Sequence, residues 1–241
     1  MSLKNHIADS ITSMNLLSGA LGVIFTFNGR LDIAFLLMLA AAVFDFFDGM
    51  VARMLNAHSN IGKDLDSLSD MVSFGVLPSM MMYTLMCDQT GSNAIWCFIP
   101  LVIAIFSGLR LAKFNVDTRQ TTNFIGLATP ASAMICGSLA YFVTADSGSF
   151  LAGWCQNYWF IPVLAIILSA LMVSEIPMFS LKIKKDGDSI TKMKRIAFLT
   201  IALLCLVVVI VASLNWSMTV FLTLVFYVLM NIVFAFVPSK E

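Results

Sequence analysis

Long apolar segments divide the 241-residue sequence and constrain its fold more than any other feature. A helix that crosses the hydrocarbon core of a bilayer needs roughly 20 mostly apolar residues. Only 12% of the residues are charged, whereas soluble domains carry about 25%. The sequence therefore predicts an all-α integral membrane protein with about eight transmembrane helices. We expect them at about residues 11–27, 31–56, 67–87, 94–114, 129–145, 158–174, 195–213 and 217–236.

The basic residues orient these predicted helices. With an even number of spans, both termini lie on one side of the membrane. The loops on that side then carry every Lys and Arg except Arg30. Basic residues accumulate in cytoplasmic loops. We therefore expect both termini in the cytoplasm and the protein in the cytoplasmic (inner) membrane.

One long polar stretch, residues 181–194, divides the chain into two parts. Residues 1–180 hold six expected spans, and residues 195–241 form an expected C-terminal transmembrane hairpin. The stretch between them is rich in lysine, which indicates a cytoplasmic linker. It serves either as an orientation signal or in recognition of lipid headgroups. The formal net charge is zero, so the composition indicates no nucleic-acid partner.

Aspartates gather where the second expected helix leads into the third. Four of them form two pairs at helical spacing, Asp45 with Asp48 and Asp66 with Asp70. We expect the second pair in the first turns of the third helix, where the positive helix end favours carboxylates. A carboxylate at membrane depth is costly and is usually functional. Asp64 lies between the pairs and fits a solvated charge at a helix end.

Four carboxylates on adjoining helices repel one another unless a cation lies among them. Hard divalent cations bind carboxylate oxygens together with substrate phosphates, and two such ions can clamp a transferring phosphoryl group. Gly49 and Ala52 allow close approach beside the first pair, and Arg53 offers a fixed positive charge for phosphate. The residues therefore favour metal-assisted phosphoryl transfer at the cytoplasmic face. A set of helix-end charges solvated by water is the alternative.

The stretch from Asp45 to Asp70 reads D-x2-D-G-x2-A-R-x8-G-x3-D-x3-D. It resembles the signature of the CDP-alcohol phosphotransferases. The resemblance implies a six-helix catalytic core, usually a homodimer, that moves a group from a CDP-linked donor to an alcohol and releases CMP. It implies Asp70 as the general base. It also implies a site for Mg²⁺ or Mn²⁺, with two ions, at Asp45, Asp48, Asp66 and Asp70. The implied CDP site consists of Asp45, Gly49, Ala52, Arg53 and Gly62.

Further stretches resemble the phosphatidylserine synthase branch of that family. They are LDSLSDMVSFGVLPSMMMY (65–83), LRLAKFNV (109–116) and NFIGLATPASA (123–133), together with the N-terminal MNLLSGALGV that starts at Met14. That branch often has Pro where this chain has Ala128, and Arg where it has Lys113. The resemblance covers roughly residues 11–175. It implies CDP-diacylglycerol and L-serine as substrates, joined by single displacement without a covalent enzyme intermediate.

Serine is a zwitterion, so its site needs a cation for the carboxylate and acceptors for the ammonium. Arg110, Lys113 and Asn115 lie at the cytoplasmic end of the fourth expected helix, level with the aspartates. We take these three as candidates for serine binding, with positive-inside anchoring as the alternative for the two cations. Two other functions stay open. One is transfer to another acceptor, such as glycerol 3-phosphate or an inositol phosphate. The other is an ion-coupled transporter that uses the aspartates as a cation site.

Overall fold

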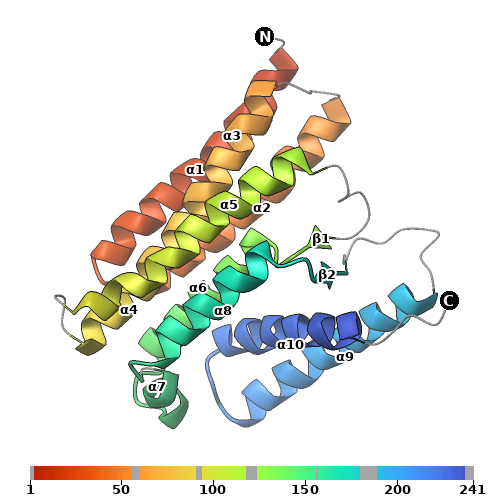
Figure 1. Ribbon diagram of the computed structural model, residues 1–241. Coiled ribbons are helices and arrows are strands. Elements are labelled where there is room, and N and C mark those ends of the chain that lie inside the picture. The colour runs from red at the N-terminus through yellow and green to blue at the C-terminus, as the bar shows by residue number, and fades with distance from the viewer. Residues whose placement is uncertain are drawn as a thin grey trace.

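Long apolar helices make up most of the computed structural model (Figure 1). It describes residues 3–55, 60–90, 94–117, 124–155, 157–179 and 189–236. The α-helices are α1 (Leu3–Phe27), α2 (Leu31–Leu55), α3 (Asn60–Asp70), α4 (Leu77–Thr90), α5 (Val102–Val116), α6 (Thr129–Ala145), α7 (Phe150–Cys155), α8 (Phe160–Val173), α9 (Ser189–Val211) and α10 (Ser217–Phe236). A π-helical segment, η1 (Met71–Val76), joins α3 to α4, and a 3-10 helix, η2 (Ile95–Leu101), leads into α5.

Within the described ranges, six helical stretches are long and apolar enough to cross a membrane. They are His6–Phe27, Leu31–Leu55, Ile61–Asp88, Ile95–Val116, Met193–Val211 and Ser217–Ala235. The other two expected spans form shorter apolar helices, α6 and α8. The predicted all-α membrane fold is confirmed, apart from a short strand pair. The number of crossings and the side of each terminus stay predictions.

The first two helices form a hairpin that turns at Asn28 and Gly29. Gly29 adopts a left-handed conformation with φ of +71°, and its N–H donates to the carbonyl of Thr26 at 3.0 Å. Glycine takes this conformation without steric cost, which is why it so commonly ends a helix. The tight turn sets α2 alongside α1 over their full length (Figure 1).

A stripe of small and polar residues on α1 lets the α3–η1 helix approach closely. A Cβ atom added to Gly19 would lie 2.8 Å from the Cα atom of Ser73. The hydroxyl of Ser73 donates to the carbonyl of Asn15 at 3.0 Å, and that of Ser69 donates to the carbonyl of Thr12 at 3.2 Å. Small side chains and interhelical hydrogen bonds are the usual basis of close helix packing in membranes. This contact fixes α3 relative to α1.

The π-helical segment η1 begins directly after Asp70 and has a local cause. Pro78 has no N–H to donate to the carbonyl four residues earlier, and its ring would collide with that carbonyl in a regular helix. The preceding turn widens instead, and the N–H of Leu77 bonds to the carbonyl of Val72. Such bulges are frequent at functional sites. The helix thus continues past Asp70 in a changed register.

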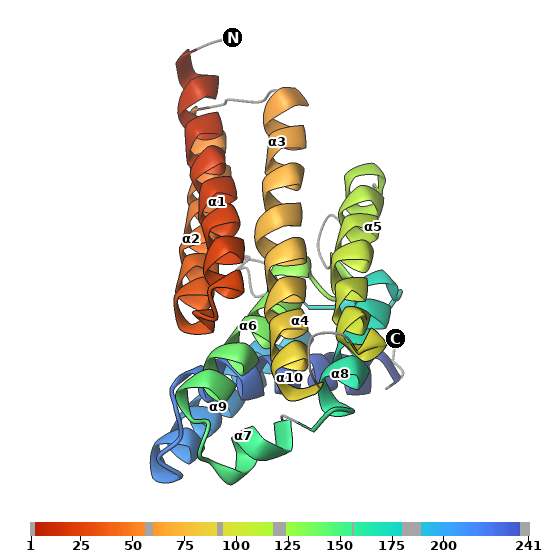
Figure 2. The same cartoon turned by 90° about the vertical axis from the view of Figure 1, so that its left-hand side faces the viewer.

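The core lies where α2, η1 and α6 meet. Phe35, Phe74 and Phe142 are fully buried there, one from each of these elements. A Cβ atom added to Gly137 of α6 would come within 2.6 Å of the ring of Phe35, so α6 packs tightly against α2. Figure 2 shows α1, α2, α3 and α5 rising together on one side of this core, with α9 and α10 on the other.

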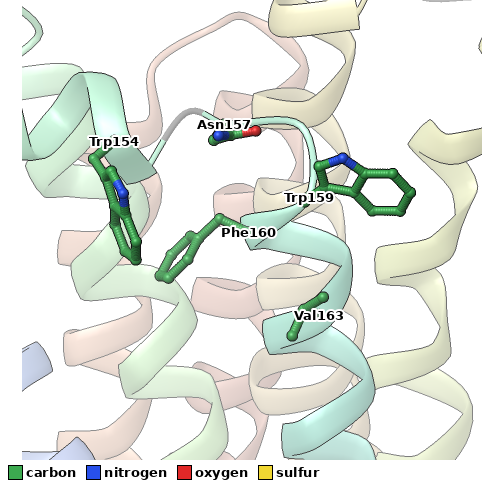
Figure 3. Close-up of a pocket in the computed structure, with 5 residues that line it drawn as sticks. All are labelled: Trp154, Asn157, Trp159, Phe160 and Val163. Atoms are coloured by element: carbon green, nitrogen blue, oxygen red, sulfur yellow. The ribbon is translucent and has the colours of Figure 1, made fainter.

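Aromatic residues collect at the end of the molecule opposite the N-terminus. A small cavity of about 230 Å³ opens there between α7 and the start of α8 (Figure 3). Trp154, Asn157, Trp159, Phe160 and Val163 line it. Tryptophans concentrate where a membrane meets water. This cavity is therefore consistent with a membrane interface, and none of its lining residues is an aspartate.

The last two helices form a hairpin that crosses the helices of the core at a steep angle (Figure 1). Helix α10 packs against α6, and α9 packs against α10. The outer face of α9 exposes large apolar side chains such as Leu199, Leu203 and Ile210, which suits contact with lipid. Helix α9 begins at Ser189, so it includes the end of the expected linker 181–194. Residues 181–188 of that linker lie outside the described ranges.

Candidate active site

Four aspartates from two helices converge near the end of the molecule that holds the N-terminus. Asp45 and Asp48 come from α2, and Asp66 and Asp70 come from α3. One carboxylate oxygen from each of Asp45, Asp48 and Asp66 lies within 4.8 Å of the other two. The side chains of Asp45 and Asp70 also interact. The structure thus brings together the two pairs that helical spacing had suggested.

The position of the second pair along its helix differs from the expectation. Helix α3 begins at Asn60, so Asp66 and Asp70 lie beyond its first turn. The favourable interaction with the helix N-terminus falls off within the first turn and does not act on them. Ile61, Leu65 and Leu68 recur at helical spacing, and this periodicity accompanies a helix that starts nearer the N-terminus than the expected start at about residue 67.

The three clustered carboxylates fit a hard divalent cation. Asp48 is only 5% exposed, and its Oδ2 atom is buried without a hydrogen-bond partner in the described parts of the chain. A buried carboxylate oxygen that lacks a partner is costly, and a bound cation removes that cost. All the donor atoms are carboxylate oxygens, which suit Mg²⁺ or Mn²⁺. Asp70 does not belong to this three-residue set.

Asp70 instead faces two polar residues from other helices. Asn15 of α1 donates from Nδ2 to Asp70 Oδ1 at 3.3 Å. Asn15 is fully buried, and its own Oδ1 has no partner among the residues that the structure describes. The guanidinium of Arg110, on α5, is close enough to attract Asp70 electrostatically. Asp70 therefore interacts with Asp45 of the carboxylate cluster and is attracted by a buried cation.

Two residues of α1 at this site were not identified from the sequence. Asn15 contacts Asp70, and the hydroxyl of Thr12, which is also buried, interacts with Asp48. The available signal was the stripe on α1, where Thr12, Asn15, Gly19 and Gly22 recur every three or four residues in an otherwise apolar helix. Polar residues at this spacing mark a buried face, but they do not identify the partner helix.

Arg110 is 7% exposed and is held by few contacts. Its Nη1 donates to the hydroxyl of Thr129 at 3.0 Å, and its guanidinium carbon lies 5.5 Å from the centre of the Phe114 ring. The Nε atom is buried without a partner in the described ranges. An arginine with spare donors in a buried position is suited to bind a carboxylate.

Thr129 reaches Arg110 because the preceding segment docks onto the end of α8. Gly126 has φ of +74°, and an added Cβ would lie 2.7 Å from the carbonyl oxygen of Met172. The N–H of Gly126 donates to the carbonyl of Ile176 at 2.9 Å. Next to it, the strands β1 (Phe124–Ile125) and β2 (Pro177–Met178) form an antiparallel pair. Only glycine fits this left-handed, crowded position.

The other two candidates for serine binding have different partners. The Nζ atom of Lys113 lies 3.9 Å from a carboxylate oxygen of Glu175, with both side chains well exposed. Asn115 donates from Nδ2 to the hydroxyl of Ser67 at 2.8 Å, and its carbonyl accepts from Lys63 at 3.1 Å. Of the three candidates, Arg110 is the one in the described ranges that is attracted electrostatically to Asp70.

The residues expected to hold a nucleotide line the adjoining part of α2. The Arg53 guanidinium folds back along the helix toward Gly49, so that an added Cβ at Gly49 would lie 3.8 Å from Nη1 of Arg53. Ala52 is half-buried on the same helix, and Gly62 is half-buried near the start of α3. Asp64 is exposed to the surroundings, as its sequence position had suggested. Next to Gly49, an added Cβ would meet only the tip of Arg53 within 4 Å.

The fold and the acidic site together define a class of membrane enzyme. The model of the CDP-alcohol phosphatidyltransferase family matches residues 5–173, and the chain belongs to that family. The match contains both aspartate pairs, Arg110 and Thr129, and it ends before β2, α9 and α10.

Several similar proteins carry more specific names. A CDP-diacylglycerol–serine O-phosphatidyltransferase of Mycobacterium leprae is 33% identical over 180 residues, which are 71% of this chain and 57% of that relative. One of Bacillus subtilis is 36% identical over 137 residues, 57% of this chain and 76% of the relative. An archaetidylserine synthase of Methanothermobacter thermautotrophicus is 34% identical over 173 residues, 70% of this chain and 68% of the relative.

Proposed function

We propose that the protein transfers a phosphatidyl group from CDP-diacylglycerol to the hydroxyl of L-serine and releases CMP. The observation that carries this proposal is the set of interactions of Asp70, which bonds to Asn15, interacts with Asp45 of the carboxylate cluster and is attracted by the buried Arg110. A carboxylate that binds the metal, the general base and the cation that binds the serine carboxylate would thus lie next to one another. The names of three similar proteins, all serine-dependent synthases, support the same acceptor.

The donor is assigned to the α2 side of the site. Asp45, Gly49, Ala52, Arg53 and Gly62 would bind the CDP group, with the Arg53 guanidinium available to a phosphate. Gly49 has no side chain, so a flat nucleotide group could lie against the α2 backbone there. The acyl chains would stay in the surrounding lipid, because moving them into a polar site would forfeit their hydrophobic burial.

Asp45, Asp48 and Asp66 would hold a divalent cation, Mg²⁺ or Mn²⁺, and a pair of ions would also engage Asp70. When bound, such ions neutralise the pyrophosphate charge and make CMP a better leaving group. The fit rests on the three clustered oxygens and on the unpartnered Oδ2 of Asp48.

The acceptor is assigned to the α5 side of the site. Arg110 would bind the serine carboxylate through its free donor, and Asn15 Oδ1 is available to the serine ammonium. Asp70 takes the proton of the serine hydroxyl, whose oxygen then forms a bond to the phosphorus on the diacylglycerol side. The bond between that phosphorus and the CMP oxygen breaks, and CMP leaves with the electron pair. Lys113 and Asn115 would contribute from the rim of this site.

The protein is expected to act in the cytoplasmic membrane, with both termini and the active site facing the cytoplasm. Arg53 and Lys63 lie on the helices that carry the aspartates, and such cations favour the cytoplasmic side. On this topology residues 1–180 form the catalytic core, 181–194 a cytoplasmic linker, and 195–241 a transmembrane hairpin. A homodimer is the expected assembly.

Other acceptors within the family are the second candidate, and the family fits transfer better than ion transport. An acceptor that bears a phosphate, such as glycerol 3-phosphate, needs a dense group of cations. On the acceptor side of the site, Arg110 is buried and Lys113 interacts with Glu175, so these two cations favour serine. Arg119, another expected cation of this face, lies outside the described residues.

An acceptor screen tests the proposal. The purified protein in proteoliposomes is given CDP-diacylglycerol with serine, glycerol 3-phosphate or an inositol phosphate, each with Mg²⁺, with Mn²⁺, or with EDTA. We expect CMP release with serine and a divalent cation only. Release with glycerol 3-phosphate and not with serine would reject the serine assignment, and ion flux without CMP release would favour a transporter.

A further inference from the structure

Side chains of α10 bind both backbone groups of one residue that follows β2. The N–H of Phe179 donates to Oδ1 of Asn231 at 2.9 Å. The hydroxyl of Tyr227 donates to the carbonyl of Phe179 at 2.9 Å. Asn231 also donates from Nδ2 to the carbonyl of Tyr227 at 2.8 Å, and it is only 2% exposed. We call Tyr227 and Asn231 the α10 clamp.

Aromatic packing strengthens this attachment and includes the other helix of the hairpin. The ring of Phe179 lies 5.2 Å from that of Tyr227, and both pack against Phe198 of α9, at 6.4 Å and 5.7 Å. Aromatic pairs at such distances stabilise a contact beyond their buried area. The C-terminal hairpin therefore holds the segment after β2 by polar and apolar contacts together.

The clamped segment leads by successive contacts to Arg110. Strand β2 pairs with β1, where Pro177 opposes Ile125. The following Gly126 bonds to Ile176 and lies so close to the end of α8 that an added Cβ would be 2.7 Å from the carbonyl oxygen of Met172. Thr129 comes three residues later and accepts the hydrogen bond from Arg110. Figure 1 shows β1 and β2 between α10 and the helices that carry the site.

The clamp lies outside the part of the chain that matches the family. The family match ends at residue 173, before Phe179 and both clamp residues. The 137 aligned residues make up 76% of the Bacillus subtilis relative, so that relative is shorter than this chain. The hairpin is therefore an addition to the matched core. It contacts that core directly through α6, and it reaches β1 by way of β2.

We propose that Tyr227 and Asn231 are positioning residues, which hold β2 so that Thr129 keeps the Arg110 guanidinium in place and thereby set the affinity for serine. This inference rests on the proposed function, because it assigns Arg110 to the acceptor. It predicts an effect on one substrate only. The donor side on α2 has no contact with the clamp recorded in the described ranges.

The test uses the full-length protein in proteoliposomes and the variants Tyr227→Phe and Asn231→Leu. Both keep the size of the side chain and remove one bond to Phe179. We expect the KM for serine to rise about three- to tenfold in each, because Tyr227→Phe loses its hydrogen bond to Phe179 and Asn231→Leu loses those to Phe179 and to the Tyr227 carbonyl. The kcat and the KM for CDP-diacylglycerol should stay within about twofold of the parent. Tyr158→Phe, an exposed tyrosine near α7, is the matched control and should leave all constants unchanged.

A second readout does not depend on turnover. Phenylglyoxal modifies accessible arginines, and its rate at Arg110 is followed by mass spectrometry without substrates. We expect Asn231→Leu to speed modification of Arg110 at least threefold and to leave that of Arg53 unchanged. Asn231→Leu in a Thr129→Val background should add less than twofold to the serine KM, because both changes act on one pathway.

Each outcome decides the inference separately from the function. An unchanged Arg110 modification rate in Asn231→Leu overturns it, whatever the enzyme accepts. An equal rise in the KM for serine and for CDP-diacylglycerol, together with a lower unfolding temperature, also overturns the inference, because it indicates general destabilisation. If the parent protein ignores serine, the proposed function fails, and faster modification of Arg110 still supports the structural link.

Discussion

Replacing Gly49 with alanine should raise stability and lower activity at the same time. The added Cβ would meet only the tip of Arg53, at 3.8 and 3.9 Å, which is ordinary van der Waals contact. Alanine is favoured over glycine in a helix interior by about 0.8–1.0 kcal/mol. The unfolding temperature should therefore rise by about 2–4 °C for a chain of this size.

The same methyl group would occupy the surface assigned to the CDP group. Overpacking a fitted site by one methyl group costs about 1–3 kcal/mol, so kcat/KM for CDP-diacylglycerol should fall about 5- to 150-fold. The KM for serine should not change. Initial rates of CMP release and thermal unfolding in detergent measure both effects. Gly153→Ala in α7, where an added Cβ meets nothing within 4 Å, is the control. A Gly49→Ala protein with parental donor kinetics would refute the assignment of this surface.

Three further changes test single residues of the site. Thr129→Val keeps the side-chain volume and removes the hydrogen-bond partner of Arg110, so the KM for serine should rise about 10- to 150-fold. Thr129→Ser keeps the hydroxyl and should retain the parental KM. An unchanged KM in Thr129→Val would contradict the role of Arg110. Asp70→Asn should abolish CMP release and retain binding of CDP-diacylglycerol by calorimetry, and sustained turnover would exclude Asp70 as the base. Asn15→Leu removes the hydrogen-bond donor to Asp70, so kcat should fall about tenfold with little change in the KM for CDP-diacylglycerol. A change in that KM alone would contradict the role of Asn15 beside Asp70.

The helices and the acidic site could be predicted because their signals are local. A run of apolar residues specifies a membrane helix with no knowledge of its neighbours. Helical spacing likewise puts Asp45 with Asp48 and Asp66 with Asp70 on common faces. Because α2 ends at Leu55 and α3 begins at Asn60, the two pairs are close in sequence and are expected to lie close together. The fixed positions of the signature supplied the rest of that expectation.

Contacts between distant segments could not be predicted, because periodicity gives a face and not a partner. Asn15 lies 55 positions before Asp70, and nothing in α1 alone indicates that they meet. Arg110 and Lys113 have the spacing of a shared face, yet their long side chains diverge to Thr129 and to Glu175. A cation at the end of a helix can reach several neighbours, and tertiary packing selects among them.

Short and irregular elements were also beyond the sequence. The strands β1 and β2 have two residues each, too few for an alternating pattern to be visible. Proline usually ends or kinks a helix. Here the helix continues through Pro78 with a π-helical segment before it, because packing against the neighbouring helices stabilises it. These elements set the position of Thr129 and the register beyond Asp70, and both matter to the site.

Transfer of isotope from serine tests the central claim most directly. Serine labelled with ¹⁸O in its hydroxyl group is supplied with CDP-diacylglycerol and Mg²⁺ or Mn²⁺, and the lipid product is analysed by mass spectrometry. The account predicts phosphatidylserine that retains the label in its phosphodiester, one CMP for each lipid formed, and no CMP when serine or the metal is withheld. Unlabelled phosphatidic acid with CMP formed in the absence of serine would contradict it.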